Sequence, residues 1–253
     1  MLVAFSLYSA VPVPQVRWER KTMRWALCFL PLIGGLVGLL EWGWLQLAIL
    51  LSVDGMLYAT VAALIPIAVT GGIHLDGLTD TCDALCSHAD QAKKLEILKD
   101  PHVGAFGVMW QTVCLLLNVA LFSQIYMTPS EFPVLCLGYG AARALGGRAI
   151  VALPCAKNSG LAYIFADHAD KTVVRRVLFW VWGLSCAAMI ALRPICGVVF
   201  TVLSLVWLMV HRRICMRVFG GMTGDLAGFL ITTTELLALA VAAIGGLLLW
   251  RFY

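Results

Sequence analysis

The sequence predicts an all-α polytopic membrane protein, built as one bundle of about seven transmembrane helices. Of its 253 residues, 61% are apolar and only 13% are charged, whereas globular domains typically have about 45–50% apolar and about 25% charged residues. The mean hydropathy is +0.91. Such a chain lacks the polar surface of a soluble domain, and several spans of about 20 residues leave little room for a second domain. We therefore expect residues 1–253 to form a single integral membrane domain.

Long apolar segments bounded by charged or turn residues predict the individual spans. The seven segments are, in order, 25–51, 56–72, 104–126, 132–153, 177–192, 195–211 and 227–250. The first is longer than a straight span needs. Its residues Pro31, Gly34, Gly35, Gly38 and Glu41 predict a kink or an interfacial second half.

Lys and Arg predict the orientation, because cytoplasmic loops carry an excess of them. A cytoplasmic N-terminus and seven spans leave only Arg193 and Arg251 on the opposite side, with Arg143 and Arg148 inside the fourth span. The other basic residues face the cytoplasm: Arg17, Arg20, Lys21, Arg24, Lys93, Lys94, Lys99, Lys157, Lys171, Arg175, Arg176, Arg212, Arg213 and Arg217. We therefore expect a protein of the cytoplasmic (inner) membrane, with the polar segments 73–103, 154–176 and 211–226 in the cytoplasm.

Charge and cysteine content exclude other classes of protein. The net charge of +4 is explained by topology and gives no support to nucleic-acid binding. Nine cysteines are an odd number, and several lie inside apolar segments, so we expect reduced thiols and no disulfide framework. Cys82, Cys86 and His88 have a spacing that zinc can use, but a fourth ligand is missing.

The segment 71–85 carries the strongest chemical signal. It places Asp76, Asp80 and Asp83 at positions i, i+4 and i+7, so a helix would present three carboxylates on one face. Carboxylates held this close repel one another unless a cation lies among them, and oxygen ligands suit Mg²⁺. His74 is a candidate base beside them. The alternative is a charged helix end in solvent.

Two glycine-containing segments precede later spans. In residues 99–107, Lys99, Asp100 and Gly104 suit a phosphate near a helix N-terminus, although a topology-determining lysine and a turn explain them too. In residues 220–228, the site candidates are Gly221, Thr223, Gly224 and Asp225, with a flexible loop as the alternative.

Ionisable residues within spans are functional candidates by default. Glu235 lies inside the last apolar segment, and Arg143 and Arg148 in the fourth are candidate counter-ions for it or for phosphates. Snorkelling is the alternative for the arginines. Together with the acidic segment, these residues predict a membrane-embedded, Mg²⁺-dependent transferase acting on a nucleotide-activated phosphate. The absence of a Walker pattern argues against an ATPase.

The segments 71–85, 99–107 and 220–228 together resemble the cobalamin synthase family, the adenosylcobinamide-GDP ribazoletransferases. The N-terminal Pro12-Val13-Pro14 and the segment 29–34 are similar to the opening of that family, so the likeness spans nearly the whole chain. The resemblance implies transfer of the cobinamide-phosphate moiety of adenosylcobinamide-GDP to α-ribazole or its 5′-phosphate, with release of GMP. This is the last step of nucleotide-loop assembly.

We expect Asp76, Asp80 and Asp83 to bind Mg²⁺, His74 to act as the base, and Asp225 to bind the metal or orient the attacking hydroxyl. Substrate binding is expected from Lys99, Asp100, Gly104, Arg143, Arg148, Gly221, Thr223, Gly224 and Glu235. The alternatives are a CDP-alcohol phosphatidyltransferase-like phospholipid enzyme, which releases CMP, and a transporter lined by the intramembrane charges. Membrane lipid, other cobalamin-pathway enzymes and further copies of this chain are the remaining candidate partners.

Overall fold

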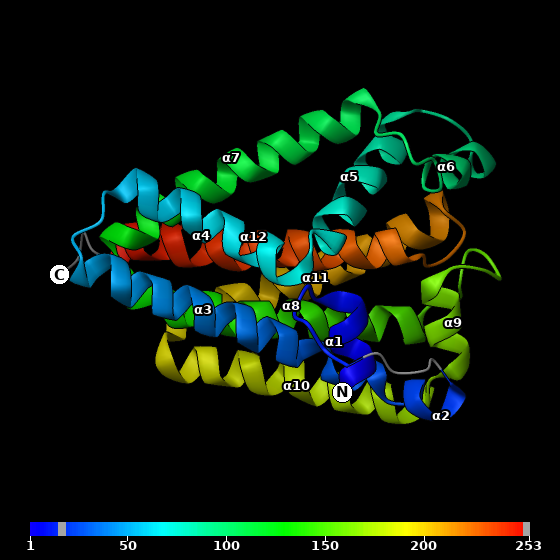
Figure 1. Cartoon of the computed structure of the whole chain (residues 1–253), viewed down its shortest axis with the longest axis horizontal. Coiled ribbons are helices and arrows are strands. Elements are labelled where there is room, and N and C mark those ends of the chain that lie inside the picture. The colour runs from blue at the N-terminus through cyan, green and yellow to red at the C-terminus, as the bar shows by residue number, and fades with distance from the viewer. Residues whose placement is uncertain (15–18, 250–253) are drawn as a thin grey trace.

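The computed structural model describes residues 1–14 and 19–249, and its regular structure there is helical. Figure 1 shows the long helices side by side along one axis. The helices are α1 (Leu2–Tyr8), α2 (Arg20–Met23), η1 (Ala26–Phe29), α3 (Leu30–Leu50), α4 (Gly55–Thr70), α5 (Ile73–Cys86), α6 (Gln91–Ile97), α7 (Ala105–Met127), η2 (Pro129–Glu131), α8 (Phe132–Ala152), α9 (Leu161–His168), α10 (Lys171–Leu192), α11 (Pro194–Val218) and α12 (Gly224–Leu249). An isolated parallel bridge pairs Cys155 with Met222.

The predicted bundle of transmembrane helices is confirmed. Six helices in the described ranges are long and apolar enough to cross a membrane, and the bent pair α4 and α5 makes a seventh if it counts as one span. The two largest differences from the predicted boundaries are that α10 already begins at Lys171 and that α11 continues to Val218. The first half of the predicted polar segment 211–226 is therefore helical. Of the basic residues used to predict the orientation, Arg17 and Arg251 lie outside the described residues.

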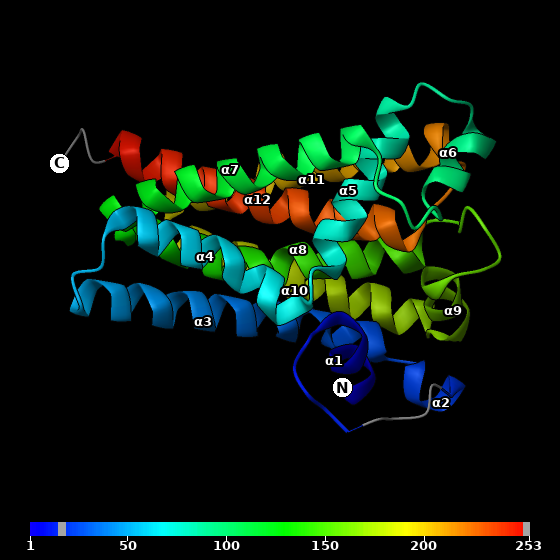
Figure 2. The same cartoon turned by 45° about the horizontal axis from the view of Figure 1, so that its top comes forward.

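The kink predicted in the first span is absent from its long helix. Its helix, α3, runs uninterrupted from Leu30 to Leu50, which corresponds to about 31 Å and matches the hydrocarbon core of about 30 Å. The excess length of the predicted span lies before α3, in η1, and α2 precedes the predicted span (Figure 2). The glycines of α3 serve close packing instead of bending: a Cβ on Gly38 would lie 2.8 Å from the carbonyl oxygen of Cys136 on α8.

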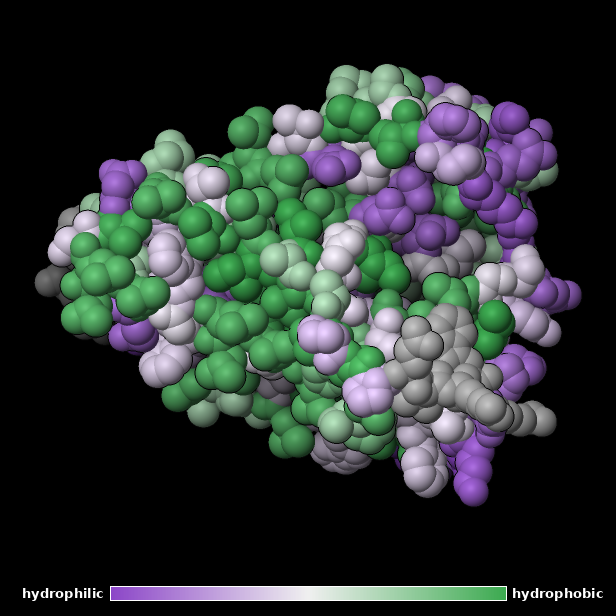
Figure 3. All heavy atoms as spheres, in the orientation of Figure 1, coloured by the Kyte–Doolittle hydropathy of each residue, from purple (hydrophilic) through white to green (hydrophobic). Residues whose placement is uncertain are grey.

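Helices α8 and α12 form the centre of the bundle. α8 packs against α3, α10 and α12, and α12 also packs against α5, α7 and α11. The outer helices α7, α10 and α11 expose many large apolar side chains, as expected where lipid is the solvent. In Figure 3 hydrophobic residues cover the middle of the molecule, and hydrophilic residues gather at one end. We call this end, which carries α5, α6, α9 and the start of α12, the polar end.

Two glycines turn the chain from α4 into α5. Gly71 and Gly72 have φ values of +64° and +80°, in the left-handed region that glycine adopts at little cost. The two helix axes differ by 96°. Helix α5 therefore does not extend α4 but crosses to pack against α7 and α12 at the polar end. Lys94 of α6 stabilises the far end of α5, because its Nζ donates to the carbonyl oxygens of Ala84 (2.7 Å) and Leu85 (3.0 Å).

Candidate active site

Helix α5 presents the three predicted carboxylates as the sequence spacing requires. Because residues 73–86 are helical, Asp76, Asp80 and Asp83 lie at i, i+4 and i+7 on one face. Asp76 is exposed, whereas Asp80 and Asp83 are half-buried. The carboxylate of Asp80 is close enough to Asp76, Asp83 and Asp225 to interact electrostatically with each of them. Two helices, α5 and α12, thus bring their acidic residues to one place.

Asp83 binds the beginning of α7. Its Oδ1 accepts a hydrogen bond of 3.2 Å from the backbone N–H of Gly107, in the first turn of that helix. A carboxylate is favourable there because the first N–H groups of a helix lack partners and the helix dipole is positive at its N-terminus. A Cβ on Gly104 would collide with the Asp83 carboxylate. Gly104, which the sequence predicts to admit a phosphate, thus makes room for a protein carboxylate.

The start of α12 is held by a cap and by a backbone bridge. The hydroxyl of Thr223 accepts a hydrogen bond of 3.2 Å from the N–H of Leu226, which is the arrangement of an N-cap. The backbone of Met222 accepts from the N–H of Ala156 (3.0 Å) and donates to the carbonyl oxygen of Pro154 (2.8 Å). Gly221 is buried at this bridge, where a Cβ would lie 2.6 Å from the Ala156 nitrogen. The 220–224 segment is therefore tied to the loop after α8.

Glycines also let α5 and α12 approach each other closely. A Cβ on Gly77 would lie 2.7 Å from the carbonyl oxygen of Asp225 and 3.1 Å from the Cα of Gly228. The two helix backbones can approach this closely only where the residues at the contact are glycines. The Gly77–Gly228 crossing is what places Asp225 beside Asp80.

A cavity of about 450 Å³ opens beside this crossing, within the size range of ligand pockets. Its walls come from α5, α12, the loop after α8, α9, the N-terminal segment and the α6–α7 connection. Of the predicted site residues, it is lined by His74, Asp76, Lys99, Thr223, Gly224 and Asp225. Anionic and cationic side chains from segments far apart in the sequence therefore face one space.

His74 is buried between this cavity and a smaller one. It lines both, and in the described part of the chain neither of its ring nitrogens has a hydrogen-bond partner. The ring of Tyr8 is stacked on it, with the two centroids 6.3 Å apart and an interplanar angle of 16°. Both ring nitrogens are buried, so one of them becomes available to a substrate hydroxyl, as a general base requires, only if the ring turns toward the cavity.

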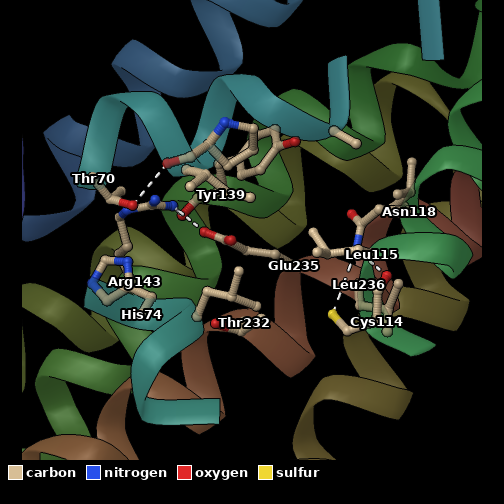
Figure 4. A pocket seen from close by; sticks show the side chains of 15 residues that line it. Thr70, His74, Cys114, Leu115, Asn118, Tyr139, Arg143, Thr232, Glu235 and Leu236 are labelled. Carbon is tan, nitrogen blue, oxygen red and sulfur yellow. Dashed lines mark hydrogen bonds and ion pairs between the residues drawn. The ribbon is translucent and has the colours of Figure 1, made fainter. Parts of the chain in front are cut away.

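The smaller cavity contains an ion pair within the bundle. Figure 4 shows Arg143 of α8 and Glu235 of α12 pointing toward each other, with His74 beside them. Arg143 is completely buried, and its Nη1 also donates to the carbonyl oxygen of Tyr139 (3.1 Å). The Tyr139 hydroxyl in turn donates to Glu41 (3.3 Å). Arg143 is thus the counter-ion of Glu235, and neither residue lines the larger cavity.

The remaining predicted residues lie outside the larger cavity. Asp100 is exposed and accepts hydrogen bonds from the backbone N–H (2.9 Å) and ring Nδ1 (2.8 Å) of His102, which hold the pKa of Asp100 below its usual range. Arg148 is half-buried on α8, and its Nε has no hydrogen-bond partner among residues 1–14 and 19–249. Asp80, Asp83, Gly104 and Gly221 support or adjoin the cavity without lining it.

No preformed metal cage is present in the described ranges: no three His, Cys, Asp or Glu side chains are grouped so as to hold an ion. This applies to Cys82, Cys86 and His88 as well as to the aspartates. Mg²⁺, however, is usually bound by one or two carboxylates together with substrate phosphates and water. The oxygen-only donor set of Asp76, Asp80 and Asp225 is compatible with that mode of binding.

The lining residues that the sequence did not predict include Tyr8, Lys157 and Tyr163. None belongs to a glycine-rich or acidic motif, so local spacing gives no signal for them. Lys157 reaches the cavity through the bridge between the 154–156 and 220–222 segments, and Tyr8 through its packing on His74. Such contacts between distant segments are determined by tertiary packing.

Comparisons with known proteins agree on one family. A family model described as cobalamin-5-phosphate synthase matches residues 1–243. The chain is 37% identical to an adenosylcobinamide-GDP ribazoletransferase of Lachnoclostridium phytofermentans, over 98% of this chain and 95% of that protein. Proteins of the same name from Halalkalibacterium halodurans and Pseudomonas fluorescens are 31% and 32% identical, covering 100% and 92% of this chain and 95% and 94% of theirs. No solved structure gives a significant match.

These matches extend over almost the whole chain and include all the helices that build the cavity. The chain belongs to the cobalamin-5-phosphate synthase family.

Proposed function

We propose that this chain catalyses the transfer of the cobinamide-phosphate moiety of adenosylcobinamide-GDP to α-ribazole, or to α-ribazole 5′-phosphate, with release of GMP. The product is adenosylcobalamin or its 5′-phosphate. One observation carries the proposal beyond family membership: carboxylates from α5 and α12 and the ammonium group of Lys99 face one cavity. Transfer from a diphosphate substrate needs both kinds of group. The carboxylates hold a metal ion, and the ammonium group neutralises negative charge on the phosphates.

The chemistry is a displacement at one phosphorus atom. A hydroxyl oxygen of α-ribazole attacks the phosphorus that is attached to cobinamide, and a new P–O bond forms. The bond from this phosphorus to the bridging oxygen of the diphosphate breaks, and GMP leaves with the electron pair. The hydroxyl proton passes to a base, for which His74 is positioned at the cavity wall with two unpaired nitrogens.

Asp76 and Asp80 are the residues that we expect to hold Mg²⁺, together with Asp225. Asp83 has only one carboxylate oxygen free for this role, since Oδ1 already accepts the N–H of Gly107. When bound, Mg²⁺ would neutralise negative charge on the diphosphate and on the leaving GMP. Asp225 lines the cavity and is also suited to orienting the attacking hydroxyl. Tight crossing of α5 and α12 fixes these carboxylates relative to one another.

The polar end is proposed to lie on the cytoplasmic side of the cytoplasmic membrane. Lys93 on the short helix α6, and Lys99 and Lys157 in connections, all lie at this end, in accord with the excess of Lys and Arg in cytoplasmic loops. Water-soluble substrates would then reach the cavity from the cytoplasm.

The test is a reconstitution from purified components. Protein in detergent or nanodiscs is mixed with GDP-cobinamide, α-ribazole and Mg²⁺, and GMP and the corrinoid product are measured by chromatography. We expect GMP and cobalamin in equal amounts, formed only when both substrates are present. CMP release from a CDP-linked alcohol, with no reaction of GDP-cobinamide, would instead indicate a CDP-alcohol phosphatidyltransferase-like enzyme. Uptake of an unchanged solute into liposomes would indicate a transporter.

A further inference from the structure

The loop between α8 and α9 is fixed against the start of α12. Its residues Pro154 and Ala156 form both backbone hydrogen bonds of the bridge to Met222, at 2.8 and 3.0 Å. Lys157 is the next residue along the loop, and Thr223 is the next residue after Met222. The bridge therefore fixes the position of Lys157 relative to Thr223, and both residues line the cavity.

The side chain of Lys157 lines the same cavity and is held by α6. Its Nζ donates to the carbonyl oxygen of Leu95 on α6, and it lines the cavity together with Lys99. No ion pair joins Lys157 to a carboxylate anywhere in residues 1–14 and 19–249. An ammonium group has three N–H donors, so donors of Lys157 remain free for a ligand.

Lys99 and Lys157 are close enough to affect each other. Partial burial, followed by the neighbouring Lys99 ammonium, lowers the pKa of Lys157 from its ordinary value. Two cations at one wall repel each other, and an anion between them would relieve this repulsion. Thr223 and the N-terminus of α12 adjoin the same wall, where negative charge is favoured.

We propose that Lys157 is a second cationic residue of the diphosphate site: with Lys99 it binds the two phosphates of the nucleotide-activated substrate. The Cys155–Met222 bridge positions it for this contact. This inference rests on the proposed function only for the identity of the substrate. The part of the ligand that this site would bind, a diphosphate group, follows from two cations that line one cavity together with the carboxylates Asp76 and Asp225.

The test measures binding of GDP and of GMP in the presence of Mg²⁺, without turnover, for the wild type and three variants. Lys157→Met should weaken GDP binding by about tenfold or more, the loss expected for one charge-assisted hydrogen bond to a phosphate. GMP binding should weaken much less, because GMP has a single phosphate. Lys157→Arg should restore most of the GDP affinity, since Arg retains the charge and the donors. Lys21→Met, at an exposed position on α2, is the matched control and should bind GDP as the wild type does.

Steady-state kinetics give a second measurement. For Lys157→Met, KM for GDP-cobinamide should rise while KM for α-ribazole stays as in the wild type. Unchanged GDP affinity in Lys157→Met, or equal losses for GDP and GMP, would overturn the inference while leaving the proposed function intact. Conversely, a wild type that binds GDP with the predicted dependence on Lys157 but forms no cobalamin would overturn the proposed function alone. The thermal midpoint of each variant separates lost binding from lost folding.

Discussion

The carboxylate of Asp83 on α5 accepts a hydrogen bond of 3.2 Å from the backbone N–H of Gly107 in the first turn of α7. This contact connects the acidic helix to a long outer helix and fixes where α5 ends relative to the bundle. It also explains the glycine at 104, since a Cβ there would meet the same carboxylate. Asp83, which the sequence predicts to be a metal ligand, therefore also has a structural role, because it holds the start of α7.

A methyl group at position 104 should disturb this contact. We expect Gly104→Ala to displace the Asp83 carboxylate, lower the thermal midpoint and reduce GMP release. Gly183→Ala is the matched control, because a Cβ at that helical glycine meets no atom within 4 Å. The control should be neutral or slightly stabilising, as Ala is the better helix former. If the two variants have the same thermal midpoint and the same rate of GMP release, the position of the Asp83 carboxylate matters for neither stability nor activity.

The crossing of α5 and α12 should be equally sensitive. Gly77→Ala places a Cβ 2.7 Å from the Asp225 carbonyl oxygen, which is backbone and cannot rotate away. The helices must then separate, and we expect kcat to fall more than tenfold, in line with the cost of misplacing reacting groups by about 1 Å. Circular dichroism at the working temperature should show that the helices remain. A variant with wild-type kcat would contradict the proposed role of this crossing.

Removal of one charge from the buried pair should destabilise the bundle. We expect Glu235→Gln or Arg143→Met to lower the free energy of unfolding by about 3–5 kcal/mol, because each leaves an uncompensated buried group. The double variant should lose less than the sum of the two single variants. Thermal or denaturant unfolding in detergent provides the double-mutant cycle. Additive losses would mean that the two side chains do not interact.

Binding of the nucleotide diphosphate should depend on the protonation of Lys157. Because the pKa of Lys157 is lowered, it loses its charge at a lower pH than an ordinary lysine, whose pKa is about 10.4. The charged form binds phosphate, so GDP affinity should be highest below the pKa of Lys157 and fall as the pH rises through it. In Lys157→Arg this fall in GDP affinity should be absent, since arginine stays protonated. GDP affinity is measured over the same pH range for both proteins, so that effects of nucleotide protonation are common to both and drop out of the comparison. Identical pH profiles of the two proteins would contradict the prediction.

The carboxylates of α5 should determine the dependence on Mg²⁺. Asp80→Asn keeps the size of the side chain but removes one charge from the centre of the acidic group, and we expect activity to fall by about 100-fold or more. Asp90→Asn is the control, since Asp90 is exposed and caps α6 through the N–H of Lys93, a role that Asn fills as well. Activity that survives EDTA, or an Asp80→Asn enzyme with wild-type rates, would exclude the metal.

Features that depend on local periodicity could be predicted from the sequence. The apolar lengths of α7, α8 and α12 and the i, i+4, i+7 spacing of Asp76, Asp80 and Asp83 are properties of single segments, and the structure has them. The extent of α11 was underestimated because Arg212, Arg213 and Arg217 end the apolar segment without ending the helix. Charge marks where a span leaves the lipid, whereas helix ends depend on capping.

The contacts that complete the site could not be predicted in this way. Lys157 enters the cavity through hydrogen bonds to a segment more than sixty residues away, and Tyr8 through stacking on His74. The sequence left Arg143 open between Glu235 and the substrate phosphates, and only the packing of α8 against α12 shows that it pairs with Glu235. Local spacing constrains one helix at a time, whereas each of these contacts depends on how two helices or loops pack.

The position of bond cleavage tests the central claim most directly. GDP-cobinamide carrying ³²P in the phosphate attached to cobinamide is incubated with the protein, α-ribazole and Mg²⁺, and the products are separated. All label should appear in cobalamin and none in GMP, because the attack is at the cobinamide phosphorus. Label in GMP or in free phosphate, or no reaction of the wild-type protein, would contradict the account.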